Sequence, residues 1–236
     1  MLVSGSIATK AARLVAAGEP IELIGPAARF VSRGGDKLEG ALARFAVTVA
    51  GKRCLDAGAS TGGFTDCLLQ RGAASVVAVD VGFGQLHERL RADPRVTNRE
   101  RTNVRALTAV DVGGPVELLV GDLSFISLRT VLPALMALVE PGGDLVLLVK
   151  PQFEAGRREA SRGKGVIRDA AIWRRVLDEV RSAASTQGAS MMEAMVSPLT
   201  GADGNVEFVV RLSARAGAPA VDLDAVVADA VATHGS

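Results

Sequence analysis

A short apolar segment that runs into a glycine-rich turn constrains the fold of this chain more than any other feature. Residues 53–56 have the pattern of a buried strand, residues 57–63 hold three glycines, and residues 64–71 have the apolar spacing of a helix. A second apolar strand follows at 75–80 and ends in Asp80. A strand, a tight turn, a helix and another buried strand are typical of a βαβ unit in a parallel sheet.

The same alternation continues along most of the chain. Further strands are predicted around Val96 and over 116–120, 145–150, 191–196 and 206–212, and helices over 37–45, 85–91, 128–139, 170–184 and 222–233. Only the short loop 200–204 separates the last two strands, so they should pair antiparallel. We therefore predict an α/β, Rossmann-like fold with a seven-stranded, mostly parallel sheet whose last strand is antiparallel.

Composition excludes several classes of protein. The 236 residues carry a net charge of +1 and only 3% aromatic side chains, so neither overall charge nor stacked aromatics indicate a nucleic-acid binder. The apolar stretch 131–139 is far shorter than the roughly 20 residues of a membrane span. Cys54 and Cys67 fit no zinc or redox spacing and are expected in the core. Two free cysteines and no signal peptide favour the cytoplasm and no membrane partner.

The glycine-rich turn predicts a cofactor site. Ser60 stands where the fingerprint of NAD-binding proteins needs a glycine, and residues 58–65 lack the lysine of a nucleotide triphosphate loop. Asp56, just before the glycines, would repel a pyrophosphate but suits a cofactor with a positively charged amino-acid end. Asp80 can hold both hydroxyls of a ribose. These features favour S-adenosylmethionine as the cofactor.

Four polar residues are predicted to surround the reacting groups. Asp122 and Lys150 follow the fourth and fifth strands, and the carboxyl ends of parallel strands line the active crevice of such sheets. Lys37 begins the helix before the first strand, and Glu207 enters the last strand. Lys150 directly follows five apolar residues, where an ammonium is costly unless carboxylates surround it.

Four motifs resemble one known family. Residues 33–38 (RGGDKL), 56–65 (DAGASTGGFT), 122–127 (DLSFIS) and 150–154 (KPQFE) are similar in order and spacing to the TlyA family, hemolysin-A-like ribosomal RNA 2′-O-methyltransferases of the FtsJ-like fold. The resemblance implies transfer of a methyl group from S-adenosylmethionine to ribose 2′-hydroxyls of cytidines in 16S or 23S rRNA, within 30S or 50S subunits. It leaves open which nucleotide is modified and the oligomeric state.

The resemblance also implies a catalytic tetrad. It consists of Lys37, Asp122, Lys150 and Glu207. We expect Lys150 to be the base, because a ribose hydroxyl is a poor nucleophile that needs a positioned proton acceptor. The expected cofactor-binding residues are Asp56, Gly58, Ala59, Ser60, Thr61, Gly62, Gly63, Phe64, Asp80, Val81, Asn103 and Asp122. No metal is expected.

The first 30 residues are predicted to be a partial S4-like RNA-binding segment and linker, followed by the methyltransferase domain over 31–236. Short strands are expected at 2–5 and 21–24. The resemblance implies two helices before the first strand, so residues 1–30 are expected to form only part of the module and not to bind rRNA independently. The candidate RNA-binding residues are Lys10, Arg13, Arg33, Arg157, Arg158, Arg162 and Lys164.

Two other classes of function compete with an enzyme. One is a ribosome-binding factor without catalysis, which the presence of all four tetrad residues argues against. The other is a membrane-active hemolysin, which the lack of a long apolar or strongly amphipathic basic segment argues against. Base methylation at carbon 5 is disfavoured because neither Cys54 nor Cys67 lies in a loop.

Overall fold

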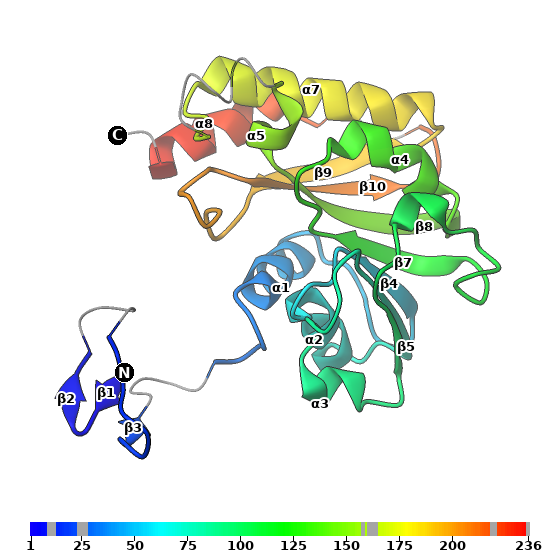
Figure 1. The fold of residues 1–236 in the computed structure, drawn as a ribbon. Helices are drawn as coiled ribbons and strands as arrows, with labels where there is room; N and C mark the ends of the chain where they lie inside the picture. Colours follow the sequence, from blue (N-terminus) through cyan, green and yellow to red (C-terminus); the bar gives the residue numbers. More distant parts are fainter. Residues whose placement is uncertain (9–12, 23–27, 157–158, 160–164, 218–220, 235–236) are drawn as a thin grey trace.

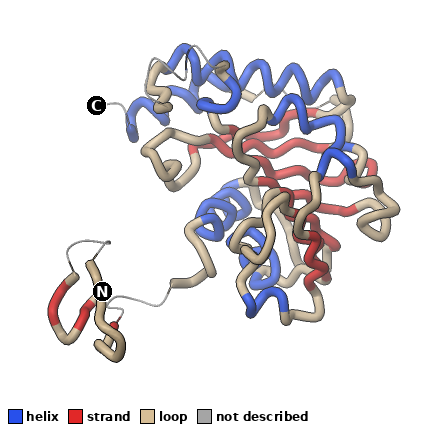
Figure 2. Tube along the Cα trace, in the orientation of Figure 1, coloured by secondary structure: helices blue, strands red, loops and turns tan. Residues whose placement is uncertain are grey.

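The computed structural model describes residues 1–8, 13–22, 28–156, 159, 165–217 and 221–234. In this part of the chain, a seven-stranded sheet lies between two layers of helices, and a three-stranded sheet is formed near the N-terminus (Figures 1 and 2). The described helices include none that is long and apolar enough to cross a membrane.

The seven-stranded sheet has the strand order β6-β5-β4-β7-β8-β10-β9. Its strands are β4 (Arg53–Ala57), β5 (Ser75–Val79), β6 (Val96–Arg99), β7 (Val116–Gly121), β8 (Val139–Val149), β9 (Ser190–Val196) and β10 (Phe208–Ser213). The first five in chain order run parallel, and β10 pairs antiparallel with both β8 and β9. The prediction of a mostly parallel sheet with an antiparallel last strand is confirmed.

Helices cover both faces of this sheet (Figure 1). One layer holds α1 (Gly34–Arg44), α2 (Gly63–Gln70) and α3 (Glu88–Arg91), and the other holds α4 (Leu128–Met136), α7 (Ala170–Thr186) and α8 (Leu223–His234). Leu42 and Leu68 contribute to the core on the first face, and Leu132 and Trp173 to the core on the second. Each fully buried leucine stabilises the fold by about 1.5–3 kcal/mol, and these cores fix the sheet that positions the site.

The largest error in the predicted boundaries lies between α4 and β8. The helix expected over 128–139 ends at Met136, and the strand expected from Leu145 begins at Val139. Val139 pairs with Val116 of β7, so sheet pairing takes over where the apolar periodicity alone would have extended the helix.

The N-terminal sheet consists of β1 (Leu2–Val3), β2 (Ser6–Ile7) and β3 (Ile21–Glu22), with β1 in the middle and both pairs antiparallel. Val3 is buried, whereas Ile7 and Ile21 are exposed. β1 and β3 lie within the two strands expected here, whereas β2 was not predicted. The S4-like assignment and the boundary between 30 and 31 stay predictions.

Candidate active site

The carboxyl ends of four strands lie at one edge of the large sheet. Asp80, Asp122 and Lys150 directly follow β5, β7 and β8, and the turn that begins at Gly58 follows β4. The N–H of Asp122 donates to the carbonyl of Ala57 at 3.1 Å, which ties the ends of β4 and β7 together. As in other open α/β sheets, this edge is where a ligand site forms.

The glycine turn is shaped by close contacts on both sides. At Gly58, whose φ is +85°, a Cβ would lie 2.7 Å from the carbonyl oxygen of Asp122. At Gly62, with φ +97°, a Cβ would lie 2.3 Å from Leu90. Glycine is therefore required at both positions, and the turn brings backbone amides to the start of α2 without side chains in the way.

Asp80 closes the turn from the neighbouring strand. One carboxylate oxygen accepts the N–H of Ser60 at 2.8 Å, and the other accepts the N–H of Gly82 at 2.7 Å. The two bonds hold the carboxylate in one orientation while its remaining lone pairs stay available to hydroxyl donors.

Asp56 lies behind the turn with no exposed surface. Its Oδ2 accepts the hydroxyl of Thr65 at 2.7 Å, whereas its Oδ1 has no hydrogen-bond partner among the described residues. Burial raises the pKa of Asp56 to about 7, and the nearby carboxylate of Asp122 adds to the increase. A buried carboxyl with an unused oxygen suits a positively charged neighbour.

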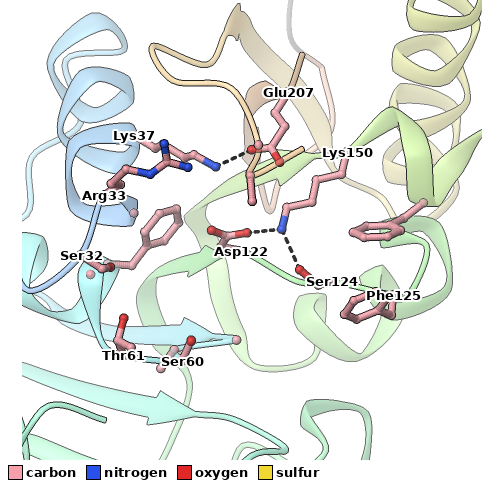
Figure 3. Close-up of a pocket in the computed structure, with 18 of the residues that line it drawn as sticks. Ser32, Arg33, Lys37, Ser60, Thr61, Asp122, Ser124, Phe125, Lys150 and Glu207 are labelled. Carbon is pink, nitrogen blue, oxygen red and sulfur yellow. Dashed lines mark hydrogen bonds and ion pairs between the residues drawn. The ribbon is translucent and has the colours of Figure 1, made fainter. Parts of the chain in front are cut away.

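The four predicted catalytic residues line one cavity of about 500 Å³. Lys37 Nζ lies 2.5 Å from Glu207 Oε2, and Lys150 Nζ lies 2.5 Å from Asp122 Oδ1 (Figure 3). The first pair is the more buried, with exposed side-chain fractions of 9% for Lys37 and 3% for Glu207. The site thus contains two lysine–carboxylate pairs, each balanced in charge.

A second cavity of about 420 Å³ adjoins the first. Its walls combine apolar side chains, among them Val104, Leu123 and Ile126, with the polar side chains of Asp80 and Asn103. Both cavities are lined by Gly58, Ser60, Asp122, Ser124 and Phe125. A ligand with an aromatic ring and a ribose in the second cavity could therefore reach the lysines of the first.

The predicted cofactor residues divide between the two cavities. The first is lined by Gly58, Ala59, Ser60, Thr61, Gly63, Phe64 and Asp122, and the second by Gly58, Ser60, Asp80, Val81, Asn103 and Asp122. Asp56 and Gly62 line neither: Asp56 lies beneath the turn, and Gly62 packs against Leu86 and Leu90.

The predicted RNA-binding residues are placed only in part. Arg33 is exposed and lines the first cavity beside Lys37 (Figure 3). Arg13 forms a 3.5 Å ion pair with Glu19 in the N-terminal segment. Lys10, Arg157, Arg158, Arg162 and Lys164 lie outside the described residues.

Sequence reasoning missed the role of two residues inside the quoted motifs. Ser124 accepts a hydrogen bond from Lys150 Nζ at 2.9 Å. Glu154 is buried and accepts the hydroxyl of Ser127 at 2.6 Å and the N–H of Leu128, so it links the segment after β8 to the start of α4. Their motif positions were a signal, but spacing gives no side-chain direction.

Two aromatic side chains line the cavities: Phe125 lines both, and Phe153 lines the first. Phe125 is 91% exposed and its ring centroid lies 5.2 Å from that of Phe153. Phe125 also adopts φ +63°, which is uncommon for a residue with a side chain. An exposed aromatic face at a cavity mouth is available for stacking with a planar ligand.

The two cysteines are buried, as expected, in β4 and α2. Burial raises the pKa of Cys54 to about 12 and also raises that of Cys67. Neither thiol lines the cavities, so neither is placed or activated as a nucleophile. The described residues contain no group of three or more His, Cys, Asp or Glu side chains that could hold a metal ion.

Solved structures of other proteins share the fold of this chain. Magnesium protoporphyrin IX methyltransferase from Synechocystis, solved with S-adenosylmethionine bound, superimposes with a TM-score of 0.54 at 15% identity over 78% of this chain and 79% of that chain, a likeness of fold alone. The residues here fit that cofactor, because Asp80 can bind a ribose, apolar walls can hold an adenine, and Asp56 has an unused buried oxygen. With the match of residues 30–214 to a methyltransferase family, the fold and the site define an S-adenosylmethionine-dependent methyltransferase.

Residues 30–214 match the FtsJ-like methyltransferase family, and the chain belongs to it. The 16S/23S rRNA (cytidine-2′-O)-methyltransferase TlyA of Mycobacterium tuberculosis is 55% identical over 183 residues, 78% of this chain and 68% of that protein. Hemolysin A of Brachyspira hyodysenteriae is 38% identical over 89% of this chain and 87% of its own length. A crystal structure from Lactococcus lactis that carries a hemolysin name has a TM-score of 0.82 at 42% identity, covering 86% of this chain and 98% of that one.

Proposed function

We propose that this enzyme transfers a methyl group to the 2′-hydroxyl of cytidine ribose in 16S or 23S rRNA, presented on 30S or 50S subunits. The observation that carries the proposal is the presence of two lysine–carboxylate pairs in the cavity that adjoins the cofactor cavity. The 55% identity to an enzyme named for this reaction supports it.

The position of Lys150 suits it to be the proton acceptor. Asp122, its ion-pair partner, lines both cavities, whereas Lys37 and Glu207 line only the first. Lys150 itself lines only the first cavity, but its ion pair with Asp122 favours it over Lys37 as the lysine that acts beside the cofactor. S-adenosylmethionine supplies a methyl group on a sulfonium. Once the ammonium of Lys150 has released a proton to solvent, its amine can take the hydroxyl proton. The O–H electron pair forms the new C–O bond as the C–S bond to the methyl group breaks with its electron pair left on sulfur.

The other residues orient the acceptor. Lys37, held by Glu207, can donate to oxygens of the acceptor ribose or its phosphate. Arg33 is exposed beside it and offers a guanidinium to the RNA backbone. Phe125 offers an aromatic face on which the acceptor base can stack.

The test is tritium transfer from labelled S-adenosylmethionine to purified 30S and 50S subunits, with the natural chain and Lys150→Ala. We expect label in the RNA, and a loss of about 100-fold to 10,000-fold in rate for the variant, the range for removal of a general base. Cofactor binding without label in either subunit would favour a ribosome-binding factor. Absence of both cofactor binding and label would contradict the proposal.

A further inference from the structure

The amine of Lys150 has two oxygen neighbours, a hydrogen-bond acceptor in Ser124 and an ion-pair partner in Asp122, whereas that of Lys37 has only Glu207 among the described residues. Lys150 Nζ contacts Asp122 Oδ1 at 2.5 Å and Ser124 Oγ at 2.9 Å, as Figure 3 shows. Lys37 Nζ forms its hydrogen bond and ion pair with Glu207 alone among the described residues. Ser124 also lines both cavities, so its hydroxyl lies where cofactor and acceptor meet.

Two acceptors fix the direction of a lysine lone pair. A neutral amine nitrogen is tetrahedral, with one bond to carbon, two N–H bonds and one lone pair. If Asp122 and Ser124 take the two N–H bonds, the chain of Lys150 and these two contacts define three corners. The lone pair must then occupy the fourth corner. With Asp122 alone, the amine can rotate about that one bond.

We propose that Ser124 is a positioning residue that aims the lone pair of Lys150 at the acceptor hydroxyl. This inference rests on the proposed function. The 2′-hydroxyl proton moves to Lys150 Nζ, and the O–H electron pair forms the C–O bond while the C–S bond to the methyl group breaks and leaves its electron pair on sulfur. The resulting ammonium keeps its ion pair with Asp122 and its hydrogen bond to Ser124, and it holds the new proton at the fourth corner.

The loop that carries Ser124 is held at both ends. Asp122 is tied to Ala57 of β4 through its N–H. At the other end, buried Glu154 accepts the hydroxyl of Ser127 and the N–H of Leu128. Because Glu154 comes only four residues after Lys150, the same segment positions the base and the loop that orients it.

The experiment compares Ser124→Ala and Ser124→Thr in methyl transfer to ribosomal subunits, with affinity for S-adenosylmethionine measured by calorimetry. We expect Ser124→Ala to lower kcat about 10-fold to 100-fold, the effect of losing one hydrogen bond to a charged group. The KM for subunits and the cofactor Kd should change less than threefold. Ser124→Thr keeps a hydroxyl and should restore most of kcat.

Ser127→Ala is the matched control, because it removes a hydroxyl from the same loop without touching Lys150. It should lower the Tm at least as much as Ser124→Ala but change kcat less. Equal losses of kcat in the two variants would overturn the inference, as would an unchanged kcat in Ser124→Ala. Absence of label with the natural chain would instead overturn the proposed function, and the inference with it.

Discussion

The two adjoining cavities differ in whether their carboxylates have ion-pair partners. In the first, Asp122 and Glu207 each have a lysine nitrogen at 2.5 Å. On the cofactor side, neither Asp56 nor Asp80 has an ion-pair partner among the described residues, and Asp80 accepts only backbone N–H groups while Asp56 accepts a hydroxyl. In the first cavity the chain's own lysines balance the negative charge, whereas on the cofactor side no side chain of the described residues does so.

This difference reflects what each region binds. S-adenosylmethionine carries a sulfonium and an ammonium, so an unbalanced negative region attracts it and is neutralised by it. The acceptor ribose brings no cation, and its phosphate is negative. The first cavity therefore needs its own lysines and must hold them in place before RNA arrives.

The largest loss of stability and activity is expected when one partner of a buried lysine–carboxylate pair is removed. Glu207→Ala leaves the buried ammonium of Lys37 without its partner, which should destabilise the fold by about 3–5 kcal/mol and remove most methyl transfer. Urea unfolding and tritium transfer measure the two effects. The double variant Lys37→Met/Glu207→Leu should recover most of the stability but none of the activity. Recovery of activity would show that this pair is only structural.

At Asp56, removal of the carboxylate is expected to stabilise the fold instead of destabilising it. Its folded pKa of about 7 lies above the usual value of 3.8, so the folded state keeps a proton that the unfolded state releases. Stability therefore falls as pH rises from about 4 to about 7, by up to about 4 kcal/mol. Without cofactor, Asp56→Asn should stabilise the protein at pH 8 and flatten this dependence in urea unfolding.

Asp93 provides a control for Asp56, because its pKa is shifted in the opposite direction. Its hydrogen bonds to Arg95 hold its pKa below the usual range, so Asp93→Asn should not stabilise the protein at pH 8. Equal behaviour of the two variants would contradict the assignment of an uncompensated charge to Asp56.

The sequence predicted the positions of the charged residues in the two cavities but not their pairing. Alternating strands and helices determined the sheet, and the rule that strand ends meet at one edge brought Asp80, Asp122 and Lys150 together correctly. Which oxygen lies near which nitrogen depends on side-chain rotamers and loop direction. That is why the contact of Lys150 with Ser124, and the link made by Glu154, required the structure.

Cofactor affinity tests the negative region directly. Asp80→Asn removes the charge and one acceptor that can hold the ribose hydroxyls, so we expect the Kd for S-adenosylmethionine to rise about 10-fold to 100-fold. Isothermal calorimetry at pH 7.5 measures it. Asp111→Asn, an exposed carboxylate that lines neither cavity, should leave the Kd unchanged. An unchanged Kd in Asp80→Asn would place the ribose elsewhere.

The smallest effect is expected at Asn103, the candidate adenine contact. Its Oδ1 accepts the N–H of Arg105 at 3.0 Å, so the side chain caps the short helix that follows, and only its amide nitrogen remains for a ligand. Asn103→Ala should weaken cofactor binding about threefold to tenfold, since one neutral hydrogen bond contributes about 0.5–1.5 kcal/mol. Asn103→Ser can keep the cap but loses the amide donor. If the serine variant binds like the natural chain while the alanine variant does not, the cap matters and adenine recognition rests on the apolar walls. If both bind like the natural chain, Asn103 does not contribute to cofactor binding.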